Sequence, residues 1–167
     1  STSGYAGNGC VANKYCAIRL RSLALGLRAT KCLADAFSCG VKATNESAWI
    51  LETAARIMHQ FSGAAVRINW LMTCSSQEAR AFLGPYADEF LVFIDPDRIA
   101  VKALGLSELP AFVLVQSNGA ISASAQGWSA ESWRHVSHSI ATLTNWSTPT
   151  IPAPGDPGTF RGTAALV

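Results

Sequence analysis

The sequence lacks the features that mark two large classes of protein. No stretch approaches the roughly 20 consecutive apolar residues that a membrane-spanning helix requires. Charged residues make up only 14% of the chain, and the net charge is +2. So small a charge argues against nucleic acid as the main partner. Hydrophobic residues, at 49%, are abundant enough for a packed core and exclude a disordered chain.

Recognisable catalytic and cofactor motifs are also missing. The sequence holds no Ser, His and Asp constellation, no glycine-rich phosphate loop and no paired-carboxylate site. His135 and His138 share one helix face, but no cysteine or pair of acids accompanies them in the sequence. We therefore expect no cofactor and no metal site.

The hydrophobic periodicity divides the chain into three regions. Residues 1–62 predict an N-terminal helical extension that contains four cysteines, with helices over about 15–27, 31–39 and 45–61. Residues 63–146 alternate between short apolar runs and amphipathic segments. Residues 147–167 are rich in proline and predict an extended tail that lies along a surface, with Phe160 and Leu166 as anchors.

The middle region predicts an α/β domain. Strands are expected at 65–72, 90–94, 111–116 and 120–125, and helices at 75–83, 98–104 and 129–146. The order is β-α-β-α-β-β-α. The first two connections between strands each contain a helix, so we expect the first three strands to be parallel. Ser117-Asn118-Gly119 predicts a hairpin that adds an antiparallel strand.

Four segments of this region resemble a known family. They are the strand RINWLM followed by Thr73-Cys74 and a helix, the segment FLVFIDPD, the segment VKALGLSELPAFVLVQSNGAI, and Gly127-Trp128-Ser129. From about Ala65 to Trp146 the chain resembles the thioredoxin superfamily. The resemblance implies a thioredoxin-like fold in which Pro110 is the cis-proline whose backbone receives an extended substrate strand beside the active cysteine. It further implies that Thr73, Leu109 and Pro110 bind peptide and that Cys74 is the candidate catalytic cysteine.

The motif at Cys74 departs from the family pattern. It reads Cys74-Ser75-Ser76-Gln77, so the position of the family's second cysteine holds an amide. A helix N-terminus stabilises a thiolate and lowers the pKa of the thiol, which would make Cys74 a single nucleophile. The alternative is a small buried hydrophobe at the start of a helix, with Thr73 or Ser75 as the cap.

The four early cysteines predict disulfides more readily than a metal centre. Folding the chain near Leu25 pairs Cys10 with Cys39 and Cys16 with Cys32, and two other connectivities remain open. Free structural thiols are the first alternative. A metal is the second, although the spacings exceed those of zinc ligands. Disulfides would favour an exported protein, whereas their absence would favour a soluble cytoplasmic one.

The residues therefore support two functions. The first is a degenerate thioredoxin-like module that lacks the dithiol C-x-x-C and serves as a binding or accessory subunit of a larger assembly with protein partners. The edge at Pro110 would then accept an extended peptide by strand addition. The alternative is an atypical thiol-disulfide oxidoreductase that uses Cys74 in mixed disulfides.

Overall fold

The computed structural model describes residues 36–41 and 45–166. In chain order the elements are β1 (Ala36–Val41), α2 (Asn45–Gln60), β2 (Ile68–Met72), α3 (Ser76–Leu83), α4 (Tyr86–Glu89), β3 (Leu91–Ile94), α5 (Ile99–Ala103), β4 (Glu108–Leu109), β5 (Ala111–Val115), β6 (Ile121–Gln126), α6 (Ala130–Thr144) and β7 (Thr163–Ala164). The strands and helices expected between residues 65 and 146 are confirmed, with α4 and β4 in addition. In this part of the chain, no helix combines the length and apolarity needed to cross a bilayer.

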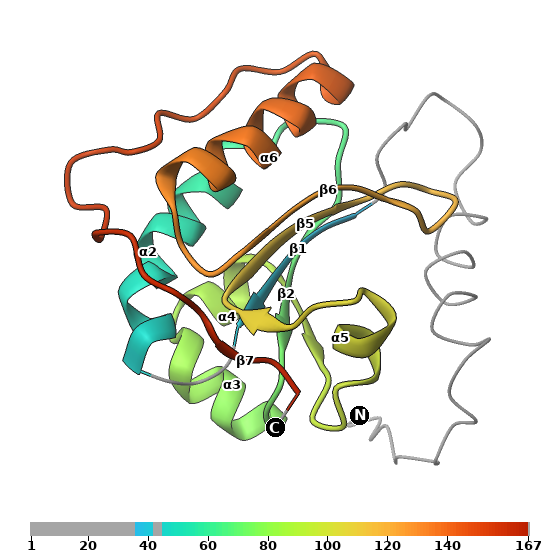
Figure 1. Ribbon diagram of the computed structural model, residues 1–167, viewed down its shortest axis with the longest axis vertical. Helices are drawn as coiled ribbons and strands as arrows, with labels where there is room; N and C mark the ends of the chain where they lie inside the picture. The colour runs from blue at the N-terminus through green and yellow to red at the C-terminus, as the bar shows by residue number, and fades with distance from the viewer. Residues whose placement is uncertain (1–35, 42–44, 167) are drawn as a thin grey trace.

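Five strands form one mixed sheet in the order β3-β2-β1-β5-β6. β1, β2 and β3 are parallel to one another, while β5 is antiparallel to both β1 and β6. β4 and β7 form a separate two-stranded sheet. Figure 1 shows α2 and α6 on one side of the large sheet and α5 on the other.

Alternation along the strands divides the apolar side chains between two cores. On β5, Phe112 and Leu114 enter the core that α2, α3 and α6 cover. Ala111, Val113 and Val115 enter a second core on the face of α5. All five residues of β5 are buried and none has a polar side chain, as is typical of a strand covered on both faces.

The expected helix over residues 31–39 is wrong for the part that the structure describes. Ala36–Val41 forms β1, the central strand of the sheet, with neighbours on both sides. Pairing with β2 and β5 overrides a weak local preference, because strand formation depends on neighbouring strands more than on the segment itself. α2 contributes Ile50 to the same core as Phe112, so the expected boundary at residue 63 falls inside one folded unit.

The expectation of three parallel strands holds for the first pair only. β2 and β3 are parallel, but β5 runs in the opposite direction. The crossover helix α5 has only five residues and spans about 7.5 Å, which is shorter than the strands it would have to retrace. The chain therefore re-enters the sheet from the end at which β3 stops, and β5 is antiparallel.

The proline-rich tail lies along the surface of the domain, as the sequence predicts. Figure 1 shows it passing from the end of α6 across α2 to β4. Phe160 pairs with Trp128 through an isolated bridge and packs against the larger core. Leu166, expected to be a second anchor, is 51% exposed, whereas its neighbour Ala165 is fully buried.

Candidate functional site

The connection between β4 and β5 contains a cis peptide bond. It lies between Leu109 and Pro110, and the carbonyl of Pro110 accepts a 2.8 Å hydrogen bond from Gly127 N–H. β5 begins at the next residue, Ala111, which is paired with Gly40 of β1. The strand beside the cis-proline is therefore β1, the strand that the sequence did not predict.

The C-terminal end of β1 lies beside the start of β5, directly after the cis-proline, because Gly40 is paired with Ala111. In the sequence, residues 42–44, which read Lys-Ala-Thr, stand between the end of β1 and Asn45, the first residue of α2. The resemblance puts the active cysteine at such a strand-to-helix junction next to the proline. The sequence between the end of β1 and the start of α2 contains no cysteine.

Cys74 does not lie on the strand next to Pro110. It follows β2, and β1 separates β2 from β5. Two strand spacings amount to about 10 Å, too far for a thiol and a proline backbone to hold one peptide between them. The expected juxtaposition of Cys74 with Leu109-Pro110 is therefore wrong. Its cause is the missed β1, because without β1 the resemblance placed the helix start after the strand RINWLM beside Pro110.

A capping box between Ser75 and Glu78 occupies backbone N–H groups at the helix start after Cys74, so these groups do not stabilise a thiolate. The Ser75 hydroxyl accepts from Glu78 N–H, and Ser75 N–H donates to Glu78 Oε2 at 2.9 Å. Burial and the negative charge of Glu78 both raise the pKa of the Cys74 thiol. The expectation of a lowered pKa is thus wrong, and Ser75 is confirmed as the cap.

Substituting Ser75 with alanine is expected to lower the free energy of unfolding by about 1 kcal/mol, because the cap is lost. Hydrogen bonds from Ser75 hold the pKa of Glu78 below its usual range. The stability that these hydrogen bonds to the Glu78 carboxylate contribute is present above the unfolded-state pKa of Glu. It disappears as the pH falls through the lower folded-state pKa. In urea unfolding, the difference in free energy of unfolding between wild type and Ser75→Ala should therefore be smaller at acidic than at neutral pH. The exposed neighbour supplies the control, Ser76→Ala, which should leave stability unchanged at both pH values.

The three predicted peptide-binding residues are not brought together. Leu109 and Pro110 are adjacent and buried, while Thr73 follows β2. The Thr73 hydroxyl is buried and has no hydrogen-bond partner among the described residues. The tail, through β7, covers the edge of β4. Sequence reasoning missed this contact. Its only signal is the run of small residues Gly-Thr-Ala-Ala after the prolines.

The predicted disulfides Cys10–Cys39 and Cys16–Cys32 lie outside the described residues, except for the backbone of Cys39. That backbone is in β1, in register with Trp70 and Phe112. Among the residues whose placement is described, no three His, Cys, Asp or Glu side chains form a group that could hold a metal ion.

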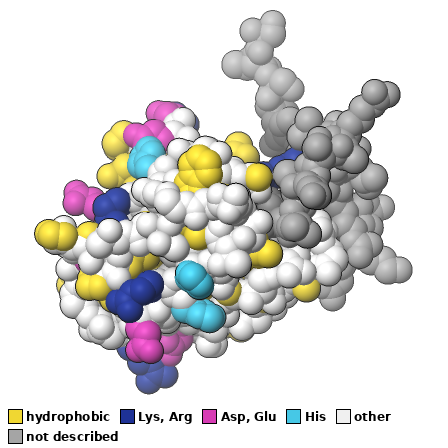
Figure 2. Space-filling view, turned by 90° about the horizontal axis from the view of Figure 1, so that it is seen from above, with side chains coloured by type: hydrophobic (Ala, Val, Ile, Leu, Met, Phe, Trp, Pro, Cys, Tyr) yellow, Lys and Arg dark blue, Asp and Glu magenta, His cyan; other side chains and the backbone are white. Residues whose placement is uncertain are grey.

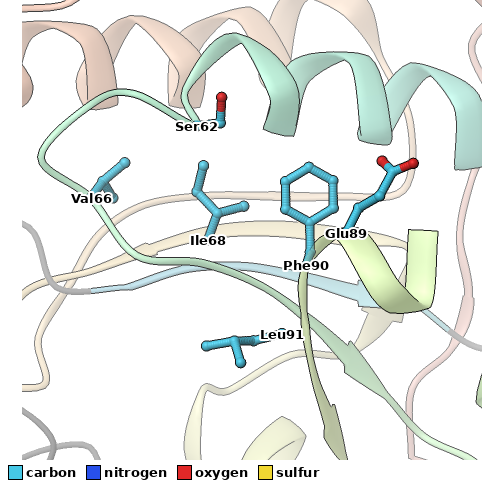
Figure 3. A pocket seen from close by; sticks show the side chains of 6 residues that line it. All are labelled: Ser62, Val66, Ile68, Glu89, Phe90 and Leu91. Atoms are coloured by element: carbon cyan, nitrogen blue, oxygen red, sulfur yellow. The ribbon is translucent and has the colours of Figure 1, made fainter. Parts of the chain in front are cut away.

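A hollow of about 260 Å³ lies beside the edge strand β3. Figure 3 shows Ile68 and Phe90 pointing together toward the end of α2, whereas Leu91 points to the opposite side. Glu89, also on its rim, pairs with His59 at 2.7 Å. The lining is mostly apolar and offers no acid, base and nucleophile together, which favours packing against another surface over catalysis.

Charge is sparse on the face that α6 presents. Figure 2 shows Lys, Arg, Asp and Glu side chains there as scattered groups rather than one continuous patch of a single sign. A second hollow, of about 580 Å³, lies between α6 and the tail and is lined by His135 and His138 together with Arg134 and Glu131. Mixed charges of this kind mark a solvated surface.

Comparisons with known proteins support the fold and leave the activity open. No protein-family model and no curated protein matches the sequence. A Chlorobium tepidum protein assigned as the thiol:disulfide interchange protein DsbE superimposes with a TM-score of 0.56, at 14% identity over 65% of this chain and 79% of that one. A Neisseria meningitidis protein assigned as a thioredoxin gives 0.54, at 14% identity over 65% and 73%. The bacterioferritin comigratory protein of Xanthomonas campestris gives 0.51, at 12% identity over 68% and 79%.

Proposed function

Because this chain contains a thioredoxin-like domain, we propose that it is a member of that fold without dithiol chemistry, and that it serves as a binding or accessory subunit for a protein partner. The observation that carries the proposal is the junction of β1 and α2. The strand that precedes it, β1, is paired with β5 directly after Pro110, and the sequence from residue 42 to residue 45 contains no cysteine. Cys74 alone does not replace a C-x-x-C pair, because the second thiol is what closes the local disulfide and releases the reduced substrate.

The environment of Cys74 also supports a role other than catalysis. The thiol is half-buried against the larger core, with its pKa raised by burial and by Glu78. A nucleophilic cysteine requires the opposite, a thiolate that is stabilised at neutral pH. Cys74 is therefore a small packing residue in this proposal, and a cycle based on Cys74 alone is the alternative that the experiments below test.

An exposed apolar edge supports a protein partner. β3 lies at one end of the sheet, and its residues Leu91, Phe93 and Ile94 are exposed although all are large and apolar. Exposed strand edges carry unpaired backbone groups and are usually protected by charge, proline or a covering segment. An apolar edge of this kind is typical of a surface on which another protein docks.

The decisive experiment restores the missing dithiol. We expect the wild-type chain to show no turnover in reduction of insulin by dithiothreitol above the uncatalysed rate. The variant Lys42→Cys/Asn45→Cys introduces C-x-x-C in the sequence that directly follows β1 and should reduce insulin measurably. The control is Gln77→Cys, which completes a C-x-x-C at Cys74 and should remain inactive. Catalysis by the wild-type chain that is lost in Cys74→Ser would overturn the proposal.

Alkylation of Cys74 provides a further prediction. Its reaction with iodoacetamide, followed at this residue by mass spectrometry, should rise with a midpoint above the pKa of about 8.5 of a free cysteine. Glu78→Gln should move the midpoint down, because it removes the negative charge and keeps the capping box. A midpoint below that of free cysteine would favour the catalytic alternative.

A further inference from the structure

The end of the tail closes against the loop that carries the cis-proline. β7 pairs antiparallel with β4, and Thr163 lies opposite Leu109, the residue directly before Pro110. Ala165 N–H continues the pairing with a 2.8 Å hydrogen bond to Ser107 O. The backbone edge at which a peptide was expected to bind is thus already occupied by this chain's own residues.

One side chain of the tail is inserted into the domain. Ala165 is fully buried in the second core, together with Leu109 and Ala111. The residues on either side of it, Ala164 and Leu166, are exposed. The contact therefore recognises one small side chain, and a larger one at this position would need space that a packed core does not offer.

The contact of the tail with β4 also requires a glycine at position 162. A Cβ atom at this position would stand 2.7 Å from the carbonyl oxygen of Leu109 and 3.0 Å from Cβ of Glu108. The first of these partners is backbone, so a substitution must move the tail away from β4. The adjacent ion pair between Arg161 and Glu108 is exposed on the arginine side and adds little to the attachment.

The loop that receives the tail is held independently of the tail. The side-chain oxygen of Gln126, on β6, accepts hydrogen bonds from Ser107 N–H at 2.7 Å and from Glu108 N–H at 3.0 Å. Gly127 N–H holds the carbonyl of Pro110. These bonds come from the domain itself, so the edge of β4 keeps its shape when the tail leaves.

We propose that residues 160–166 are a tethered, exchangeable ligand of this edge, and that the partner displaces them with an extended segment of the form Gly-x-x-Ala. The inference rests on the proposed function, because it names a second surface, besides the edge of β3, through which a binding module would engage a partner. Beyond the bridge of Phe160 with Trp128, the attachment consists of a two-residue strand and one buried methyl group, which is small enough to exchange. Tethering gives the tail an effective concentration of about a millimolar, so a free segment competes poorly until the tail is weakened.

The test measures binding of a fluorescein-labelled peptide with the sequence of residues 159–167 to the full-length chain by fluorescence anisotropy. The variant Gly162→Ala should bind this peptide at least tenfold more tightly than wild type, because its own tail no longer fits. Gly158→Ala is the matched control, since a Cβ there meets nothing within 4 Å, and it should behave as wild type. A peptide carrying the Gly162→Ala change should bind tenfold more weakly to the same variant.

A second measurement avoids any variant that fails to fold. Unlabelled peptide added to the wild-type chain at about 10 mM, well above the effective concentration of the tethered tail, should speed hydrogen exchange of the tail amides of Phe160 and Ala165, while amides within β5 stay protected. Equal peptide binding by wild type and a folded Gly162→Ala chain, or unchanged exchange in the tail, would overturn the inference. Either result would leave the proposal of a fold without dithiol chemistry intact, because that proposal is tested by thiol reactivity.

Discussion

Replacing Trp133 with alanine is expected to lower the free energy of unfolding by about 3–5 kcal/mol, the largest effect of any single change considered for this domain. Trp133 is fully buried at the start of α6. Its ring packs against Phe112 at a centroid distance of 5.0 Å and edge-on against Trp128 at 5.2 Å. Its indole N–H donates to Gly127 O at 2.9 Å. Truncation removes these contacts and leaves a large cavity and an unpaired carbonyl.

Chemical denaturation followed by circular dichroism checks this expectation. Trp133→Phe should cost less, because a ring remains and only the hydrogen bond and part of the volume are lost. Trp146→Ala is the control for loss of a tryptophan as such, since Trp146 is 41% exposed and its removal should cost less than half as much. Equal effects at positions 133 and 146 would contradict the assignment of Trp133 to the centre of the core.

The second large effect is expected at Asp156, which fastens the tail to α2. Its carboxylate is 4% exposed and receives hydrogen bonds from Arg56 at 2.9 Å, from Thr53 at 2.8 Å and from Ala153 N–H at 2.7 Å. Asp156→Ala leaves these donors without their acceptor. We expect a loss of about 2–3 kcal/mol, below the value for a fully buried pair because Arg56 is partly exposed.

Thermal and urea unfolding measure this loss, and a second ion pair provides the comparison. Arg80 and Asp88 are both 71% exposed, so Asp88→Ala should change stability by no more than about 0.5 kcal/mol. The loss of stability in Asp156→Asn should lie between those of Asp156→Ala and Asp88→Ala, because asparagine keeps one acceptor oxygen and loses the charge. An Asp156→Ala chain as stable as wild type would show that the tail does not depend on this carboxylate.

The sequence predicted those features correctly that depend on interactions between residues close together in the chain. Ser75 with Glu78 three residues later predicts a helix start, and the capping box is observed. Ser129 caps α6, its hydroxyl accepting a hydrogen bond from Ser132 N–H. The apolar run before Asp95 is a strand. The carboxylate of Asp95 accepts hydrogen bonds from the backbone N–H groups of Ile99 and Val101 at the start of α5. In each case the partners stand within six residues of one another.

The errors share one physical origin, which is long-range pairing. β1 is a strand because β2 and β5 flank it, and no residue near Cys39 encodes those neighbours. Because the segment of β1 was predicted as a helix, Cys74 was expected at the place beside Pro110. The number and spacing of strands along the chain do not state their order across a sheet.

The sequence by itself determined the thioredoxin-like α/β pattern, the helix caps, the hairpin and the proline before β5, because each depends on residues close together in the chain. Only the tertiary structure decided which strand stands beside Pro110 and that the tail closes on β4. Those facts depend on contacts between segments more than 50 residues apart, as the hydrogen bond between Arg161 and Glu108 illustrates. Backbone pairing and small buried side chains make such contacts, and they leave little trace in composition or periodicity.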